Sequence, residues 1–295
     1  MIEDDLFTSH IQLDVVPELK EPFFISAFLG WSNAGSVASD TIEYLYEILN
    51  PEVFGKFNNE HFSHFTSERP LGHVQDGLLK DLERATSQLK YWKNPSGNHD
   101  LVFLLSQEPH LNWELYSHVI LQLVHRMKIR RLYTLGGVQD TISHSAPPQI
   151  SIVGTSLELV QQTMEVEASI QAANYYGPIS IHSRLIKMCM ENDIEGVSLW
   201  GHVPAYLQRS PRAVATLVNI FSSVVGMECP VGGLLQKAIE LDRKISEALA
   251  RDPNLREFVE AIENKDEEDS PLNGEDKVIR LNEFLRKDPF KDQES

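Results

Sequence analysis

The chain has 295 residues, of which 42% are apolar and 23% charged, a balance typical of a globular protein. Its formal net charge of −17, from 43 acidic and 26 basic residues, disfavours electrostatic binding to nucleic acid or to an anionic membrane. No apolar run approaches the roughly 18 residues that a membrane-spanning helix needs, and the N-terminus is acidic where a signal peptide is basic, so we expect a cytoplasmic protein.

The first third of the chain predicts a buried strand and then a helix. Residues 23–29 form a compact apolar run that ends at Gly30. Ser32 or Asn33 can cap a helix carrying the apolar residues from Val37 to Leu49. The pattern further predicts short strands over residues 53–57 and 60–65 and a helix over residues 78–89.

The rest of the chain alternates strands with longer helices. We predict strands over 101–105, 132–135, 150–153 and 197–200, and helices over 113–127, 156–164, 180–191 and 210–225. Strands separated by long helices favour a parallel sheet that is covered on both faces. The sequence therefore predicts a three-layer α/β/α domain with a mostly parallel central sheet.

Three parts are expected along the chain. Residues 1–230 form the α/β/α domain, and residues 231–264, with a purely helical pattern, form a C-terminal helical appendage. Residues 265–295 form an acidic flexible linker with a short amphipathic tail, because the stretch KDEEDSPLNGED is acidic and broken by proline and glycine. The tail is either a tethered docking helix or a clasp on the chain's own surface.

The predicted helix at 210–225 is more apolar than a single outer helix requires. Either the C-terminal helices cover the excess or a second subunit does. The apolar residues are Val214, Leu217, Val218, Ile220, Phe221, Val224 and Val225.

The most informative stretch is residues 131–154, RLYTLGGVQDTISHSAPPQISIVG. A predicted strand stops at the pair Gly136 and Gly137, and a polar loop carrying Asp140 and His144 follows. Ligands usually meet an open parallel sheet at the carboxyl ends of its strands, so we expect the polar loops there to share one edge. The candidate pocket residues are Ser32, Asn33, Glu108, Gly136, Gly137, His144, Tyr176 and His202.

Several of these residues also have a purely structural explanation. Ser32 and Asn33 suit a helix cap, and Glu108 precedes a proline in a turn. Tyr176 belongs either to the pocket or to a fixed Tyr-Gly-Pro turn into the next helix. An acid beside a histidine can act as a general base, and Glu108 with His144 is the pair that we expect for that role.

We assign no catalytic residue, metal site or cofactor from the sequence. The chain has no G-x-G-x-x-G, no P-loop and no G-x-S-x-G motif. His61, His64 and His73 lack an acidic or thiolate companion at the spacing that zinc sites use. Cys189 and Cys229 are expected to be free thiols, with Cys189 buried in a helix.

Taken in order, these motifs resemble the proteasome assembly chaperone 2 family over about residues 23–239. The resemblance rests on GWSNAG at 30–35, Trp113, LGG and HSAP between 135 and 147, YGP at 176–178 and LWGHVPAY at 199–206. It implies an α/β/α fold like that of nucleoside phosphorylases and hydrolases, no established catalytic set and a homo-oligomer, often a trimer.

The same resemblance implies a possible protein partner. Eukaryotic and some archaeal relatives help to assemble proteasome α rings, and certain archaeal relatives dock through a C-terminal tail of a hydrophobic residue, a tyrosine and any residue. This chain ends in KDQES, so we do not expect docking by that route.

Two functions of different classes follow. The first is a non-enzymatic, homo-oligomeric protein, with a trimer favoured, that is assembly-chaperone-like or protein-binding. The second is a small-molecule hydrolase, phosphorylase or carboxylate–amine ligase with a pocket at the carboxyl ends of the strands. The second function requires Glu108 and His144 to lie within hydrogen-bond reach of each other, directly or through one water.

Overall fold

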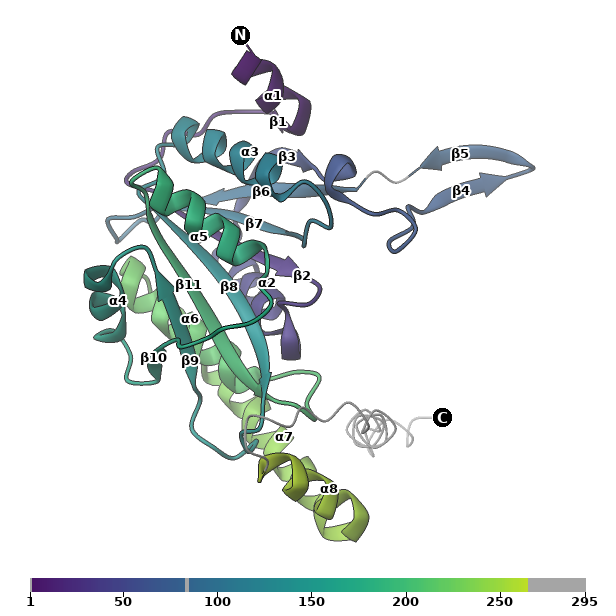
Figure 1. Ribbon diagram of the computed structural model, residues 1–295, viewed down its shortest axis with the longest axis vertical. Coiled ribbons are helices and arrows are strands. Elements are labelled where there is room, and N and C mark those ends of the chain that lie inside the picture. The colour runs from purple at the N-terminus through teal and green to yellow at the C-terminus, as the bar shows by residue number, and fades with distance from the viewer. Residues whose placement is uncertain (1, 83–84, 265–295) are drawn as a thin grey trace.

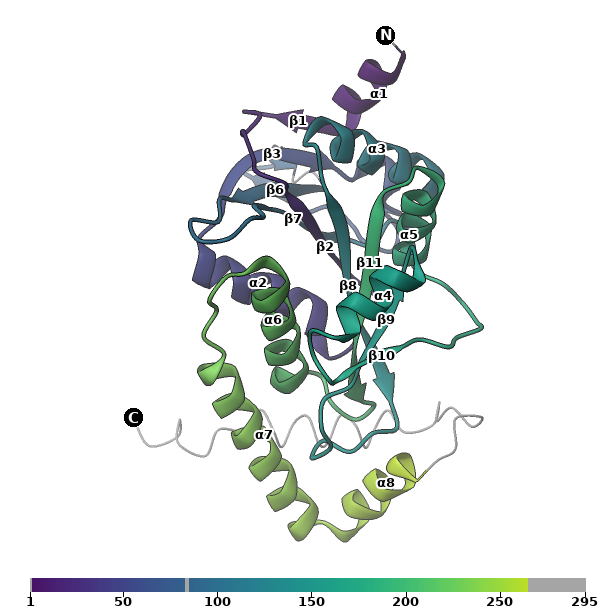
Figure 2. The same ribbon diagram turned by 90° about the vertical axis from the view of Figure 1, so that its left-hand side faces the viewer.

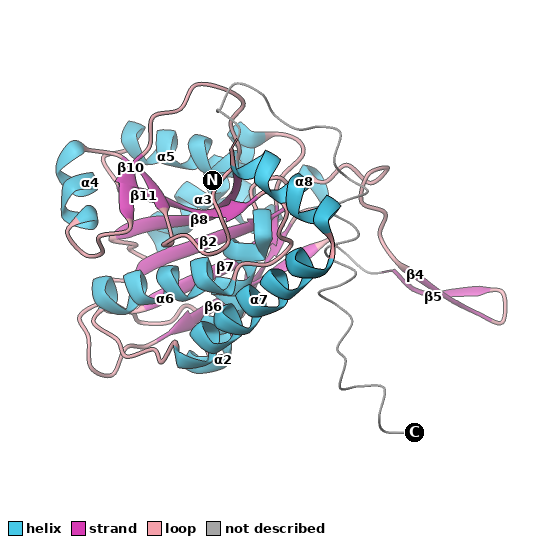
Figure 3. Ribbon diagram, turned by 90° about the horizontal axis from the view of Figure 1, so that it is seen from below, coloured by secondary structure: helices cyan, strands magenta, loops and turns pink. Residues whose placement is uncertain are grey.

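The computed structural model describes residues 2–82 and 85–264. The linker and tail predicted at 265–295 lie outside these residues. The predicted fold class is confirmed, because a large, mostly parallel central sheet is flanked by helices on both faces (Figures 1 and 3). No helix within the described ranges is both long and apolar enough to cross a membrane.

The strands of the described ranges form one large sheet and one separate hairpin. They are β1 (Ile11–Leu13), β2 (Phe23–Leu29), β3 (Glu52–Asn58), β4 (Gly72–Gln75), β5 (Leu78–Leu82), β6 (Thr86–Trp92), β7 (Leu101–Gln107), β8 (Arg131–Asp140), β9 (Ile150–Gly154), β10 (Ile170–Ala172) and β11 (Glu195–Pro204). The sheet has the order β1-β3-β6-β7-β2-β8-β11-β9-β10, and β4 pairs with β5. Its centre is parallel from β7 through β2 and β8 to β11, and β9 runs antiparallel to β11.

The helices pack in two layers against this sheet. They are α1 (Ile2–His10), α2 (Val37–Leu49), α3 (Trp113–Arg126), α4 (Leu157–Met164), α5 (Ile181–Glu191), α6 (Pro211–Val225), α7 (Gly232–Arg251) and α8 (Pro253–Glu263). The buried residues of α2, α6 and α7 share one apolar cluster, and those of α3 and α5 share a second. Figure 2 shows α7 and α8 continuing beyond the end of the sheet.

Strand β2 shows why a continuous apolar run predicts the centre of the sheet. Phe23, Ile25 and Ala27 belong to the cluster on the α2 and α6 side. Phe24 and Phe28 belong to the cluster on the α3 and α5 side. Successive side chains of a strand point to opposite faces of the sheet. A strand that is covered on both faces therefore has a continuous apolar sequence, without the alternation of apolar and polar residues that a half-exposed strand shows. The predicted bounds of this strand are confirmed.

Helix α6 begins with Ser210, whose Oγ accepts the N–H of Ala213, and with Pro211 in the first turn. Its side chains Leu217, Val218 and Phe221 are fully buried. The cluster that holds them also contains residues of α2, α7 and α8, so the chain's own helices cover the apolar surface of α6. A second subunit is not required to explain this helix.

The helix predicted over residues 78–89 is wrong. This segment holds β5 and the first part of β6, and β5 forms a hairpin with β4 that projects from the body of the molecule (Figure 1). Asp76 and Gly77 between the two strands both have positive φ, 53° and 75°, as a two-residue hairpin turn of type I′ requires. The strand predicted over 60–65 is wrong as well, because a 3₁₀ turn occupies Glu60–Phe62.

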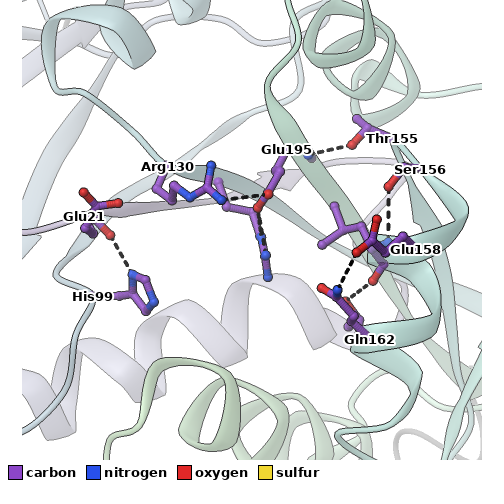
Figure 4. A network of polar contacts seen from close by, with 12 residues as sticks. Glu21, His99, Arg130, Thr155, Ser156, Glu158, Gln162 and Glu195 are labelled. Atoms are coloured by element: carbon purple, nitrogen blue, oxygen red, sulfur yellow. Dashed lines mark hydrogen bonds and ion pairs between the residues drawn. The ribbon is translucent and has the colours of Figure 1, made fainter.

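The amino end of the sheet carries a polar network (Figure 4). Glu195, the first residue of β11, accepts hydrogen bonds from the guanidinium groups of Arg130 and Arg131 at 3.0 and 2.8 Å. The backbone N–H of Gly196 lies 3.2 Å from Oγ1 of Thr155, at the end of β9. These bonds join the starts of β8 and β11 to the turn before α4. The predicted pocket lies at the opposite end of the sheet, where the parallel strands have their carboxyl ends.

Candidate functional site

The paired glycines do not end their strand, contrary to the prediction. Strand β8 continues through Gly136 and Gly137 to Asp140, and β11 continues alongside it to Pro204. A Cβ on Gly136 would lie 2.5 Å from the ring of Trp200, and one on Gly137 would lie 2.2 Å from the carbonyl oxygen of Ala34. The glycines therefore admit a neighbouring ring and a neighbouring backbone without interrupting the sheet.

The connection after β2 lies directly against this part of β8. Asn33 forms a parallel bridge to Gly137, and the N–H of Gly137 donates to the carbonyl oxygen of Ser32 at 2.7 Å. Oδ1 of Asn33 accepts the N–H groups of Ala38 and Ser39 at 3.1 Å each, at the start of α2. The capping explanation thus accounts for Asn33, and the predicted proximity of Asn33 to the paired glycines is observed too.

Ser32 is fully buried, and its partner is a residue that the sequence did not indicate. Nε2 of His182, near the start of α5, lies 3.2 Å from Oγ of Ser32. The His182 ring packs on Trp200 with 4.7 Å between ring centroids. Burial lowers the pKa of His182 to about 3 from its ordinary 6.5, so the imidazole is neutral at neutral pH.

Glu108 fixes the start of α5. Its Oε1 accepts the N–H of Ile181, the first residue of the helix, at 3.0 Å. Burial raises the pKa of Glu108, and this hydrogen bond opposes part of that increase. The carboxylate lies at the helix N-terminus, where a negative charge is favourable. Its position is explained by its contact with the helix.

His144 lies in a different environment from Glu108. Its Nδ1 and its backbone N–H are both 2.9 Å from the hydroxyl oxygen of Tyr206, which donates to Oε1 of Glu263 at 2.6 Å. Glu263 is the last residue of α8, so this chain of bonds attaches the loop after β8 to the C-terminal helix. The enzymatic alternative required Glu108 and His144 to act as a pair. In the structure Glu108 binds the start of α5 and His144 binds Tyr206, so each has its own partner.

His202 instead joins Asp140 and a serine that the sequence analysis missed. Nδ1 of His202 lies 2.6 Å from Oδ2 of Asp140, and Nε2 lies 2.6 Å from Oγ of Ser151. The hydrogen bond with His202 is the main reason that the pKa of Asp140 is lowered. A sequence signal for Ser151 did exist, because a lone serine between Ile150 and Ile152 faces away from the side that these two buried residues occupy.

The remaining predicted pocket residue is Tyr176. The Tyr176 side chain is fully exposed on the connection from β10 to α5, so it does not line an enclosed pocket. A cavity of about 20 Å³, room for about one water, lies between the loop that carries His144 and helices α6 and α7. A hollow of about 410 Å³ lies elsewhere, lined by residues of β6 and β7 that include Ser87 and Ser106. None of the predicted pocket residues lines that larger hollow.

The described residues contain no group of three or more His, Cys, Asp or Glu side chains that could hold a metal ion. Cys189 and Cys229 are free and buried.

Comparison with protein families gives a match to the PAC2 family model over residues 27–249, which is most of the chain. The chain belongs to the PAC2 family. The resemblance inferred from the sequence motifs is thereby confirmed. The comparison with curated proteins gives no match.

Solved structures agree with this assignment. A PAC2 family protein from Streptomyces avermitilis is 26% identical, with 77% of this chain and 95% of that chain covered and a TM-score of 0.67. A proteasome-assembly chaperone homologue from Mycobacterium tuberculosis is 24% identical over 80% of this chain and 99% of that chain, with a TM-score of 0.70. PbaB, an archaeal proteasome activator from Pyrococcus furiosus, is 19% identical over 81% of this chain and 97% of that chain, with a TM-score of 0.65. The last two likenesses concern the fold.

The PAC2 match covers most of the candidate site but not the C-terminal helix that contacts it. The match includes Ser32, Asn33, Glu108, the paired glycines and His202, but it ends at residue 249, inside α7. Helix α8 and Glu263, which holds the hydroxyl of Tyr206, lie beyond it. The contact between His144, Tyr206 and Glu263 therefore combines residues inside the PAC2 match with a residue outside it.

Proposed function

We propose that this PAC2 family protein is a homo-oligomeric, assembly-chaperone-like protein that acts by binding other protein surfaces, a role that needs no catalysis. The observation that carries the proposal is the projecting β4–β5 hairpin. Its side chains Val74, Leu78, Leu79 and Leu82, and Leu71 just before β4, are each more than half exposed. An isolated two-stranded hairpin is only marginally stable in water. Exposed apolar surface of this kind is typical of sites that bind another protein.

Three further exposed apolar side chains lie on connections at the carboxyl edge of the sheet, and we propose that they form a second surface. We call it the rim patch and define it by Trp31, Leu111 and Ile179, which are exposed by 64%, 45% and 58%. The bond from Ile181 to Glu108 and the contact between His182 and Ser32 fasten together the segments that carry these side chains. The rim patch therefore sits on fixed backbone, as a docking surface requires.

We propose that the hairpin of one copy packs on the rim patch of the next. A contact between two different surfaces is heterologous, and when it closes it forms a ring. Two copies could also make this contact reciprocally, so our choice of three copies rests on the trimer that the family resemblance implies. The net charge of −17 is spread over each copy, so apolar contacts have to outweigh a general repulsion between copies.

The test compares the mass of the assembled protein between matched variants. Leu78→Ser with Leu79→Ser removes apolar surface from the hairpin, and Trp31→Ser does so at the rim patch. Leu157→Ser on α4 is the control, because that leucine is strongly exposed but lies outside both surfaces. Light scattering after size exclusion is expected to give a trimer for the wild type and the control, and smaller species for the other two. Unchanged mass in both would refute the proposed contact.

We further propose that the assembled ring binds a protein partner. The support is family membership together with relatives described as a proteasome-assembly chaperone homologue and an archaeal proteasome activator. Affinity purification from the native host should recover a partner with the wild type and lose it with the hairpin variant. Recovery of no protein by a wild-type trimer would contradict the partner while leaving the oligomer intact.

A further inference from the structure

The contact between Asp140, His202 and Ser151 has the connectivity of a nucleophile, a base and an orienting acid. Both links, Asp140 Oδ2 to His202 Nδ1 and His202 Nε2 to Ser151 Oγ, measure 2.6 Å. The lowered pKa of Asp140 keeps its carboxylate ionised at neutral pH. An ionised acceptor fixes the imidazole proton on Nδ1, which leaves the lone pair of Nε2 to accept the hydroxyl proton of Ser151.

The pairing of three strands places these side chains on one face of the sheet. His202 lies opposite Val138 and Pro204 lies opposite Asp140 in the parallel pair of β11 with β8. Trp200, two residues before His202, lies opposite Ser151 in the antiparallel pair of β11 with β9. Directly paired residues and residues two apart along a strand share a face. The arrangement is therefore fixed by the sheet and not by a loose surface loop.

This part of the face is open to solvent. Val138 is 37% exposed and Val153, two residues beyond Ser151, is 43% exposed. His202 and Asp140 retain 20% and 27% of their side-chain exposure. The connection from β10 to α5 passes in front of β11 and β8 in Figure 1 and stands away from the sheet in Figure 2. A small molecule can thus reach the Ser151 hydroxyl with apolar side chains on either side.

We propose that Ser151 is a nucleophile that hydrolyses small esters with an apolar acyl group, with His202 as its general base and Asp140 as the positioning residue. As the bond from Ser151 Oγ to the carbonyl carbon forms, the hydroxyl proton passes to His202 Nε2. The ester C–O bond then breaks, and the alkoxide takes that proton and leaves as an alcohol. Water, deprotonated by His202, attacks the acyl-serine and releases the carboxylic acid and the serine.

The position of Ser151 within a strand also limits the rate of the proposed ester hydrolysis. The serine lies inside a strand with β10 on one side and β11 on the other, so its backbone N–H lies in the plane of the sheet. Serine hydrolases commonly use the N–H groups beside the nucleophile to stabilise the developing oxyanion, and loss of one such donor slows acyl transfer by about 10²–10³-fold. We therefore expect slow turnover, which makes covalent labelling of Ser151 the more sensitive measurement.

The experiment treats the full-length chain with an alkyl fluorophosphonate and locates the adduct by peptide mass spectrometry. We expect the adduct on Ser151 and none on Ser145, an exposed serine of the nearby loop. His202→Gln is expected to slow labelling about a hundredfold or more, since it removes the general base. Asp140→Asn should also slow it, and Asp140→Glu should restore part of the rate. A folded wild type that gives no adduct at Ser151, or labels at the same rate with Gln at 202, overturns the proposal.

Substitutions at His202 also remove a structural contact, so a second variant keeps the test independent of folding. Ser151→Cys preserves size and places a thiol beside Nε2, whereas the native thiols at 189 and 229 are buried. We expect iodoacetamide to alkylate Cys at 151 at least tenfold faster in the folded protein than in urea, because the imidazole takes the thiol proton. A slower reaction in the folded protein also overturns the proposal. p-Nitrophenyl butyrate should give a burst of about one equivalent of nitrophenol per chain, followed by slow release.

Discussion

Gly136→Ala perturbs the place where β8 passes beneath Trp200. The added Cβ would lie 2.5 Å from Cε3 of the indole and 2.7 Å from two further ring atoms, so the ring has to move by roughly 1 Å to regain ordinary van der Waals distance. The ring is held on two sides. Its Nε1 donates to Oγ of Ser198 at 2.8 Å, and its face packs on His182.

The expected cost follows from these contacts. Overpacking of this kind destabilises by about 1–3 kcal/mol, and weakening of the indole hydrogen bond adds about 1 kcal/mol. A total of about 2–4 kcal/mol corresponds to a fall in melting temperature of about 3–7 °C for a chain of this size. The change should be visible by near-ultraviolet circular dichroism and by the fluorescence of the displaced indole.

Gly232→Ala is the matched control for this variant. Nothing lies within 4 Å of a Cβ at Gly232, the first residue of α7, so we expect a neutral or slightly stabilising effect. Trp200→Leu in the Gly136→Ala background should relieve the clash, so that the double variant loses less stability than the sum of the single variants. Equal melting temperatures for Gly136→Ala and Gly232→Ala would refute the packing that we describe.

Two further predictions concern buried polar groups. The pKa of about 3 for His182 in the folded chain means that its contribution to the free energy of unfolding is complete above pH 6.5 and falls as the pH drops toward 3. His182 should therefore contribute about 2 kcal/mol to the stability lost between pH 7 and 5 in urea titrations, so the loss should be smaller in His182→Gln, and equal losses in both would contradict this explanation. Tyr206→Phe removes the donor to Glu263 and should cost about 1–3 kcal/mol. Hydrogen exchange should then accelerate in α8, and protection in α8 that matches the wild type would show that this bond does not hold the helix.

Much of the fold was predictable because the length and spacing of the apolar runs indicated which segments are buried strands and which are helices. Strand β2 is buried on both faces, and its run of seven apolar or small residues marked its bounds. Helix α3 showed apolar residues at helical spacing, and the structure ends it one residue before the predicted end. The hairpin was missed because we interpreted the apolar residues over 78–89 as helical and overlooked Asp76-Gly77, a pair that suits a two-residue turn.

The candidate site was predictable only in part. Asn33, Gly136 and His202 do meet at the carboxyl edge, because the crossovers bring β2, β8 and β11 together. The partners of these residues were not visible in the sequence. Ser151 and Asp140 are 51 and 62 positions away from His202, and only the register of three strands brings them within hydrogen-bond distance. A buried histidine such as His182 carries no sequence signal, since an apolar helix face surrounds it.

The central claim is that the β4–β5 hairpin of one copy contacts another copy, and cross-linking between isotopically distinct chains tests it most directly. Lys80 lies on β5 with its side chain exposed. Equal amounts of unlabelled and ¹⁵N-labelled protein are mixed, dissociated, reassembled and treated with an amine-reactive cross-linker. We predict inter-chain cross-links from Lys80, about half of which join an unlabelled chain to a labelled one, as random reassembly from equal amounts requires. If every cross-link from Lys80 stays within a single chain, the account is contradicted.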